Sequence, residues 1–520
     1  MTTMHETTRS RTSPNPGPRA NTVDGILHRS AARFPERTAL KFEGRKSTYR
    51  ELDDTVSRAA TYLLSLGLRR GDRVAAYGTN SDAYVVGFLA AARAGLIHVP
   101  INYALRGGEL RYLLDQSGAR AVLVDPALID YVDEVRQDIT VEHILVLNDG
   151  IDSLQAVEDN DDLPNVDVDE CDLVQLLYTS GTTSKPKGAM MTHGAFVHEY
   201  TSSIIALDMT PDDNPLICMP LYHSAGMHVF MLPYLAVGAT ITLLATPDIP
   251  KILQTIEEDQ IGSMFLAPTV WVPLSNHPDL DTRNLSSLRK AQYGASIMPV
   301  TVLSRLRHRF PDLGFYNCFG QSEIGPLATV LGPDDHEKRP ASCGRAIMFV
   351  ETRVVDTDGH VVPDGEPGEV LYRSPQLCLG YWNNDDATAE AFRDGWFRSG
   401  DLVTRDSQGF ITVIDRIKDV INTGGILVAA REVEDALYLH DAVAEVAVIG
   451  TPHDKWIEAV TAFVVLRSGV PTPNDQELFR HTKEHLAPFK VPKIIRFVNN
   501  LPRNQSGKLL KRELRNIELT

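Results

Sequence analysis

Residues 178–188 read Tyr178-Thr179-Ser180-Gly181-Thr182-Thr183-Ser184-Lys185-Pro186-Lys187-Gly188, and they follow the apolar stretch Leu173-Val174-Gln175-Leu176-Leu177. The apolar stretch predicts a buried strand, and an amphipathic helix is expected from about Gly194, so we place the run at a strand-to-helix turn. Gly181 and Gly188 permit the positive φ that a loop needs when its backbone N–H groups converge on an anion. The hydroxyls add hydrogen-bond donors, and the two lysines add charge. We interpret the run as a phosphate-binding loop, although an ordinary mobile surface loop can have a similar composition.

The spacing of this loop is not that of a Walker motif. Gly181 is followed seven residues later by Gly188 without a Gly-Lys-Ser/Thr ending, and Gly507-Lys508 is followed by Leu509, which disfavours a P-loop ATPase. The run instead resembles the phosphate loop of the adenylate-forming superfamily, which includes acyl-CoA synthetases, fatty acyl-AMP ligases, firefly luciferase and peptide-synthetase adenylation domains. Those proteins usually have glycine at the position of Ser184. Fatty acyl-CoA synthetases are the members that the chain resembles most, over about residues 24 to 515.

Length and charge restrict the possible functions. A chain of 520 residues is too long for one core and predicts two or three domains. The formal net charge of −17 argues against a nucleic-acid partner, because like charges repel. No apolar run approaches the roughly 20 residues that cross a bilayer, so no transmembrane segment is expected. The five cysteines are widely spaced, which fits a reducing cytoplasm better than a disulfide framework.

The pattern along the chain predicts an α/β fold with several layers. Residues 1–22 are polar and rich in proline, and we expect a disordered tail there, with a transit peptide as the alternative. A large N-terminal adenylation domain is expected over 23–415, with layered α/β subdomains and a β-rich subdomain at about 349–372. An exposed acidic loop is predicted at 158–169. A small, mobile α+β domain is expected over 416–520, with strands at 443–448 and 460–466, a helix at 475–486 and a polar loop at 502–508.

The resemblance also implies further motifs in a fixed order, and the chain contains them. The segment 220–226 resembles the Pro-Leu-aromatic-His segment that walls the acyl pocket, and Gly294-Ala295-Ser296 resembles the loop that lies against adenine. Read alone, His223 would be a structural histidine and the three small residues a tight turn. The residues that the resemblance assigns to ATP or AMP binding are Thr179, Ser180, Gly181, Thr182, Thr183, Lys187, Gly294, Ala295, Ser296, Asn317, Phe319, Gly320, Asp401 and Arg416.

The sequence Asn317-Cys318-Phe319-Gly320-Gln321-Ser322-Glu323 resembles the family's Tyr-Gly-x-Thr-Glu motif, with Phe and Ser as conservative changes. Phe319 can stack on adenine, and Asn317 can bond the amino edge of the base. Ser322 can donate to the α-phosphate, and Glu323 offers a hard oxygen ligand for Mg²⁺. Outside this motif, Glu323 would be interpreted as a solvated surface carboxylate.

Asp401 and Arg416 are the expected ribose contacts. Gly400-Asp401 belongs to a segment, 395–402, that matches the motif whose aspartate binds both ribose hydroxyls, because a carboxylate accepts two hydrogen bonds at once. Arg416 is its partner in the family. In isolation, these residues would be interpreted as a turn and a surface ion pair.

Lys508 ends the run 502–508, which matches the catalytic loop of the family's small C-terminal domain. A mobile ammonium there would stabilise negative charge as a carboxylate attacks the α-phosphorus, although a lysine near the end of a chain is more often solvated. The catalytic residues implied by the resemblance are Lys508, Glu323, Ser322 and His223. The family rotates its C-terminal domain between two half-reactions, which implies a hinge at Lys418 and a thiol tunnel beside Gly424 and Gly425.

Two departures from the family pattern bear on which acid is activated and on which thiol accepts the acyl group. His223 stands where peptide synthetases carry the aspartate that pairs with an α-ammonium, so an amino acid is disfavoured. The pocket candidates are mainly apolar and indicate a fatty or other hydrophobic acid, with aromatic acids still possible: His223, Met227, Val270, Tyr293, Ile297 and Pro326. The same apolar composition would be found if these residues packed in the protein core and lined no pocket.

After Gly425 the chain reads Ile426-Leu427-Val428 where relatives have Glu-Asn, so the acceptor is either CoA or a phosphopantetheinylated acyl carrier protein. ATP and Mg²⁺ are the expected cofactors. A protein that binds the nucleotide without catalysis is a third alternative. No pattern in the sequence indicates an oligomeric state.

Overall fold

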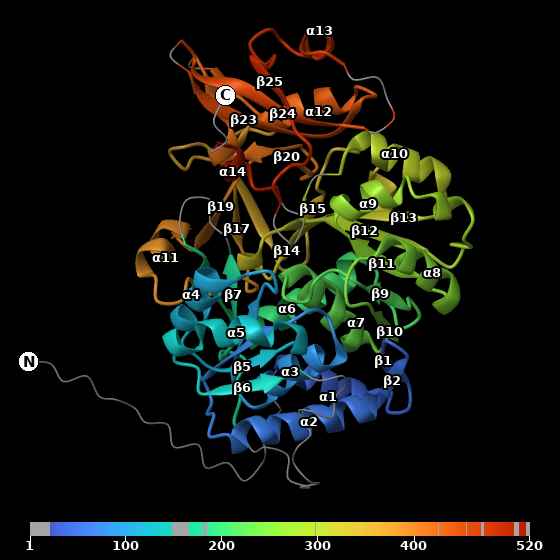
Figure 1. Cartoon of the computed structure of the whole chain (residues 1–520), viewed down its shortest axis with the longest axis vertical. Helices are drawn as coiled ribbons and strands as arrows, with labels where there is room; N and C mark the ends of the chain where they lie inside the picture. Colours follow the sequence, from blue (N-terminus) through green and yellow to red (C-terminus); the bar gives the residue numbers. More distant parts are fainter. Residues whose placement is uncertain are drawn as a thin grey trace, which may run out of the picture.

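The described part of the chain folds around four β-sheets (Figure 1). The computed structural model describes residues 21–147, 166–179, 185–296, 298–424, 426–453, 455–467, 469, 473–503 and 509–515. The predicted tail at 1–22 and acidic loop at 158–169 lie largely outside these ranges. Within them, no helix is both long and apolar enough to span a bilayer. The α/β fold class predicted from the sequence is confirmed.

A six-stranded sheet carries the strand that leads into the predicted phosphate loop. Its order is β6-β5-β3-β4-β7-β8, and every neighbouring pair is parallel except β7 with β8. Val74 and Ala76 of β3 face one core cluster, while Ala75 and Tyr77 face another. Both faces are therefore covered, which explains the nearly continuous apolar strands. The strands are β3 Arg73–Tyr77, β4 Ile97–Ile101, β5 Ala119–Val124, β6 His143–Val146, β7 Leu173–Thr179 and β8 Lys187–Thr192; α4 Gly107–Ser117 and α5 Ile129–Val135 cover the outer face.

A nine-stranded sheet follows the order β15-β14-β13-β12-β11-β9-β10-β1-β2. Its strands are β1 Thr38–Phe42, β2 Arg45–Thr48, β9 Pro215–Ile217, β10 Ile241–Leu243, β11 Ser263–Leu266, β12 Lys290–Gly294, β13 Gly314–Gly320, β14 Leu327–Leu331 and β15 Arg345–Ala346. Apolar residues of this sheet and of the six-stranded sheet belong to one core. Helices that contribute to that core include α1 Val23–Arg33, α2 Tyr49–Ser65, α3 Asp82–Arg93, α6 His193–Ala206, α7 Leu232–Val237, α8 Ile249–Asp259, α9 Pro268–Leu274 and α10 Val300–Arg309.

Helix α2 shows how the sequence sets these elements. Thr48 accepts a hydrogen bond from the backbone N–H of Glu51, and the Glu51 side chain bonds back to the Thr48 backbone, which closes a capping box at the helix start. The apolar face of α2 is fully buried, and it comprises Leu52, Val56, Ala59 and Leu63. Spacing of three and four residues places these side chains on one side of the helix.

The third sheet is β-rich, as predicted for the region after residue 349. It contains β16 Glu351–Val355, β17 Gly368–Arg373, β18 Phe392–Arg393, β19 Trp396–Arg405 and β20 Ile411–Arg416, with α11 Asp385–Ala391 beside it. Between β17 and α11 the chain returns to β8, where the Leu379 backbone N–H donates to Met190 O and Ala189 bridges Tyr381. This return brings residues 374–382 beside the strand that follows the phosphate loop.

The C-terminal residues form a separate sheet, drawn at the top of Figure 1 in orange and red. Helices α12 and α13 pack on one face, and Leu514 of α14 packs with Leu501 on the other. The predicted strands at 443–448 and 460–466 and the predicted helix at 475–486 are confirmed. The predicted domain boundary after Asp415 falls one residue before the end of β20. The elements are β21 Ile421–Thr423, β22 Ile426–Val428, β23 Val443–His453, β24 Ile457–Leu466, β25 Ile494–Phe497, α12 Ala430–Tyr438, α13 Asp475–His485 and α14 Lys511–Arg515.

Candidate active site

Glu323 joins three segments that are far apart in the sequence. Its side chain is 7 % exposed, and its Oε1 atom accepts hydrogen bonds from Thr179 Oγ1 at 3.1 Å and from the Tyr381 hydroxyl at 3.0 Å. Burial and the adjacent Glu323 carboxylate raise the pKa of Tyr381, so its hydroxyl stays protonated and donates. The last residue of β7 therefore lies against the predicted Mg²⁺ ligand.

The predicted strand-to-helix turn is wrong in one respect. Lys187 and Gly188 begin β8, which pairs antiparallel with β7, and α6 starts only at His193. The described residues on the two sides of the loop thus belong to antiparallel strands, because β8 returns along β7 before α6 begins. The Lys187 ammonium lies 5.3 Å from the centre of the Tyr381 ring, next to Glu323. Four of the predicted phosphate contacts lie outside the described residues, namely Ser180, Gly181, Thr182 and Thr183.

Ser322 connects the motif to the predicted acyl-pocket segment. Its Oγ lies 3.0 Å from Ser224 Oγ, one residue after His223. The His223 backbone N–H bonds to Pro220 O, and a π-helical stretch, η4 Ala225–Met231, begins two residues later. This contact places His223 beside the Ser322–Glu323 turn.

The predicted adenine loop follows β12 and lies against β13. A Cβ atom on Gly294 would come within 2.1 Å of Cys318 O, so only glycine allows the two strands to approach this closely. Ala295 has a φ of +62°, and both it and Ser296 are exposed. The turn therefore lies exposed at the end of the strand.

Two residues of β13 lie near that turn. The Asn317 side-chain amide donates to Ser342 O at 2.9 Å, and this orients its oxygen, the atom that an adenine amino group needs as acceptor. Phe319 is partly buried. At Gly320, a Cβ atom would meet Pro326 O at 2.0 Å, so this glycine lets β13 close on the turn that follows Glu323.

Asp401 and Arg416 lie opposite each other in the β19–β20 ladder. Their side chains form an ion pair with Arg416 Nε 2.8 Å from Asp401 Oδ1, and Arg416 Nη1 also donates to Ser399 O at 3.0 Å. The Asp401 residue is 4 % exposed. A planar guanidinium held at both ends fixes the orientation of the carboxylate beside it.

The C-terminal candidates are only partly described. Lys418 is an exposed residue of a short 3₁₀ helix, η8 Ile417–Asp419, that directly follows β20. Gly424 has a φ of +65° and packs on the Trp456 ring. Gly425 and Lys508 lie outside the described residues. Nearby Lys511 is not a solvated terminal lysine, because it is largely buried and forms an ion pair with Glu434 at 2.9 Å.

The predicted acyl-pocket residues differ in their surroundings. Met227 and Tyr293 lie in the main core, Pro326 is buried and Val270 is partly buried, while Ile297 lies outside the described residues. The Tyr293 hydroxyl contacts His336 Nε2 at 3.0 Å. Burial lowers the pKa of His336 to about 4, and its Nδ1 donates to Gly332 O, so Nε2 accepts from Tyr293.

Sequence reasoning missed Tyr381, Glu199 and Gln376. Tyr381 bonds Glu323 directly, and its signal was available in the run Gly380-Tyr381-Trp382-Asn383, an aromatic turn between a strand and a helix. Glu199 and Gln376 contact the backbone after Glu323. A charged residue in the apolar helix α6 was the only signal for Glu199.

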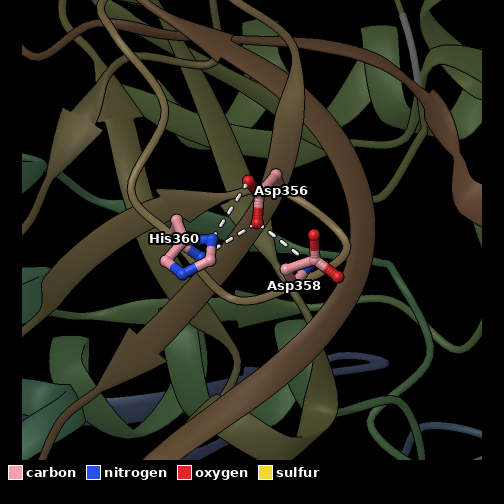
Figure 2. Close-up of side chains that lie close together, drawn as sticks. All are labelled: Asp356, Asp358 and His360. Atoms are coloured by element: carbon pink, nitrogen blue, oxygen red, sulfur yellow. Dashed lines mark hydrogen bonds and ion pairs between the residues drawn. The ribbon is translucent and has the colours of Figure 1, made fainter.

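A second group of potential metal ligands lies in the turn between β16 and β17. Figure 2 shows Asp356, Asp358 and His360 close together on this exposed hairpin. Asp356 Oδ1 accepts the backbone N–H groups of Asp358 and His360, so the cluster is explained by a hydrogen-bonded turn. Glu323, by contrast, is buried and reaches from the turn to the start of the phosphate loop.

The chain matches two family descriptions. Residues 27–382 match "AMP-binding enzyme", and residues 432–508 match "AMP-binding enzyme C-terminal domain". The first match covers more than half of the chain. The first match contains Glu323, and the second lies within the C-terminal sheet and its helices.

Characterised relatives resemble the chain over nearly its whole length. A feruloyl-CoA synthase from Amycolatopsis sp is 36 % identical, with 94 % of this chain and 97 % of the relative covered. A medium/long-chain-fatty-acid–CoA ligase from Mycobacterium tuberculosis is 33 % identical, with 96 % and 90 % covered. The structure of o-succinylbenzoate CoA synthetase from Bacillus subtilis with its acyl-adenylate has a TM-score of 0.86 and 28 % identity, with 95 % and 98 % covered. The chain therefore belongs to the AMP-binding enzyme family, as an AMP-forming acid–CoA ligase.

Proposed function

We propose that the chain activates a hydrophobic carboxylic acid with MgATP and passes the acyl group to the thiol of CoA. The observation that carries this proposal is the hydrogen bond between Thr179 and Glu323, which joins the start of the phosphate loop to the Ser322–Glu323 turn. The ion pair between Asp401 and Arg416 supports a ribose site on the third sheet.

In the first half-reaction, a carboxylate oxygen of the acid attacks the α-phosphorus, and the bond to pyrophosphate breaks. The hydroxyl-rich loop at 179–183 and Lys187 bind the phosphates, and Ser322 donates to the α-phosphate. Asp401 accepts hydrogen bonds from the ribose, and Phe319 packs on adenine. Lys508 stabilises the charge that develops on the phosphate oxygens.

Glu323 is the residue that fits Mg²⁺. Among the described residues, both of its side-chain hydrogen bonds go to Oε1, which leaves Oε2 for a hard cation. Magnesium would neutralise charge on the triphosphate. Tyr381 and Thr179 hold the carboxylate in one orientation, so the ligand is preorganised before the nucleotide arrives.

In the second half-reaction, the CoA sulfur attacks the acyl carbonyl, and AMP leaves. Lys508 must withdraw first, because the thiol approaches the acyl carbonyl carbon from the side of the C-terminal domain. We assign the hinge to Lys418, two residues after the end of β20, and the thiol path to the segment at Gly424 and Gly425.

A fatty acid is the first candidate substrate, because the proposed pocket residues are apolar. An aromatic acid is the second, and a specific contact favours it: the rings of Tyr103 and Tyr222 meet edge to face at 5.6 Å, next to His223. Such a pair offers ring edges and faces to a planar acid. The feruloyl-CoA synthase and fatty-acid ligase relatives support both classes.

An acid panel tests the substrate class. Fatty, cinnamate-type and α-amino acids are incubated with MgATP and hydroxylamine, and the trapped hydroxamate is measured. We expect product from hydrophobic acids, with affinity rising by about 0.8 kcal/mol per buried methylene until the pocket is filled. Amino acids should give no product, because His223 cannot pair with an ammonium. Failure of every acid to give hydroxamate while ATP still binds would favour a non-catalytic nucleotide-binding protein.

The acceptor is tested with preformed acyl-AMP. CoA and a phosphopantetheinylated carrier protein are supplied separately, and AMP release is followed. We expect rapid release with CoA, since a small thiol needs no protein docking surface. Faster release with the carrier protein would instead assign the exposed side chains of Ile426 and Leu427 to carrier binding.

A further inference from the structure

A carboxyl group is buried directly behind the Ser322–Glu323 turn. Glu199 lies in the middle of α6 and is fully buried. Its Oε1 accepts hydrogen bonds from Ser203 Oγ at 3.1 Å and from the Leu327 backbone N–H at 3.2 Å. Within the described ranges, no lysine, arginine or histidine forms an ion pair with it. Glu199 therefore connects α6 to the first residue of β14 by hydrogen bonds alone.

Gln376 completes this contact from a third segment. Its side-chain amide is fully buried and donates to Glu199 Oε2, to Leu327 O at 3.1 Å and to Ile324 O at 3.3 Å. The Gln376 Oε1 atom accepts from Ser202 Oγ at 2.8 Å, which fixes the orientation of the amide. The pair thus holds the backbone on both sides of Gly325 and Pro326.

The turn has little room to move. Gly325 has a φ of +105°, and a Cβ atom there would lie 3.2 Å from Glu199 Oε2. The Cys378 backbone N–H, two residues after Gln376, donates to Glu323 O at 2.8 Å. Residues 323 to 327 are therefore tied to α6 and to the segment at 374–382. A shift of either support would move the Ser322 hydroxyl and the Glu323 carboxylate.

Stability alone does not explain this arrangement. A carboxyl group that is buried without a cation costs several kcal/mol relative to water, and an apolar side chain of similar size would avoid that cost. Burial raises the pKa of Glu199 well above its ordinary value, whereas the Leu327 and Ser203 hydrogen bonds oppose the rise. The arrangement instead provides the hydrogen bonds that hold the turn.

We propose that Glu199 and Gln376 are positioning residues that hold the Ser322–Leu327 turn in place for MgATP. Through the turn they position the Ser322 hydroxyl and the Glu323 carboxylate. Neither side chain touches the reacting atoms. The inference rests on the proposed function of Ser322 and Glu323, but it predicts a magnesium dependence that can be measured without turnover.

Glu199→Gln is the central test, because it replaces one carboxyl oxygen with an NH₂ group. The remaining side-chain oxygen can still accept from Ser203 and Leu327, but the new NH₂ group would face the NH₂ of Gln376, and one of the two must turn away. We expect the kcat of acid-dependent ATP–pyrophosphate exchange to fall by about 10- to 100-fold, as misplacement of a positioned group does. The Mg²⁺ concentration for half-maximal exchange should rise.

Ser203→Ala is the matched control. It removes a hydrogen bond of similar length to the same Glu199 oxygen without touching the turn, so exchange should stay within about twofold, in the range of a remote neutral substitution. If Glu199→Gln does not fold, Ser202→Ala is the milder variant, because it removes only the hydrogen bond that orients the Gln376 amide. It should lower the kcat of exchange and raise the Mg²⁺ concentration for half-maximal exchange, as Glu199→Gln does. The reciprocal variant, Glu199→Gln with Gln376→Glu, should recover part of the loss, because an amide again faces a carboxyl group.

Calorimetric titration of ATP with and without Mg²⁺ separates this inference from the proposed function. If no acid supports ATP–pyrophosphate exchange by the unmodified protein, the proposed function fails. Glu199→Gln must even then reduce the Mg²⁺-dependent part of ATP binding. Equal effects of Glu199→Gln and Ser203→Ala on exchange and on this binding would overturn the positioning role. Unchanged Mg²⁺ dependence in Glu199→Gln would overturn it as well.

Discussion

Replacement of Lys508 by alanine is expected to lower the rate of acyl-adenylate formation by about 10²–10³-fold, which corresponds to about 3–4 kcal/mol of lost transition-state stabilisation. The reason is electrostatic. Charge grows on the phosphate oxygens as the acid attacks, and an ammonium in the role proposed for Lys508 would stabilise that charge more than it stabilises bound ATP. Acid-dependent ATP–pyrophosphate exchange measures this step directly.

Thioester formation from supplied acyl-AMP should be largely spared in the same variant, because the proposed domain rotation withdraws Lys508 before the thiol attacks. Residues on either side of the loop are anchored, since Arg503 and Leu509 form a β-bridge and Leu514 packs against Leu501, so the substitution should not unfold the domain. Lys483→Ala, at an exposed position of α13 in the same domain, is the control and should leave both steps unchanged. Equal loss of both steps in Lys508→Ala would argue against domain rotation.

Local patterns predicted much of the fold. The face of α2 could be read from spacing, because a helix brings residues three and four apart to one side. Buried strands such as β3 and β5 could be read from short apolar runs, and the C-terminal elements followed in the same way. Asp401 and Arg416 were expected together only through the family resemblance, and the β19–β20 register places them opposite each other.

The rest of the fold and of the candidate site depends on contacts that the local sequence does not encode. Strand β8 was missed because Lys187 and Gly188 look like loop residues, and only pairing with β7 makes them a strand. Glu199, Glu323 and Gln376 lie far apart in the sequence and meet only when the two large sheets share a core. A charged residue in an apolar helix indicated that Glu199 needs a partner, but not which one.

Glu323→Gln should reduce magnesium-dependent exchange by about 10²-fold, comparable with the loss of another preorganised electrostatic contact. The amide is nearly isosteric, and its oxygen can still accept from Thr179 and Tyr381, so the turn should keep its position. What is lost is the negative charge, and a neutral amide is a much weaker ligand for a hard divalent cation. Exchange is measured against Mg²⁺ concentration at fixed ATP and acid.

The expected signature is a higher Mg²⁺ concentration for half-maximal exchange together with a lower plateau, because the cation both binds less tightly and is held less well in the transition state. Glu390→Gln, an exposed substitution in α11, controls for the loss of one negative charge near Tyr381 and should shift neither quantity. A Glu323→Gln protein with an unchanged magnesium curve would show that the cation is held elsewhere. The hydrogen bonds from Thr179 and Tyr381 would then serve only to close the turn onto β7, and the positioning role proposed for Glu199 and Gln376 toward MgATP would fail as well.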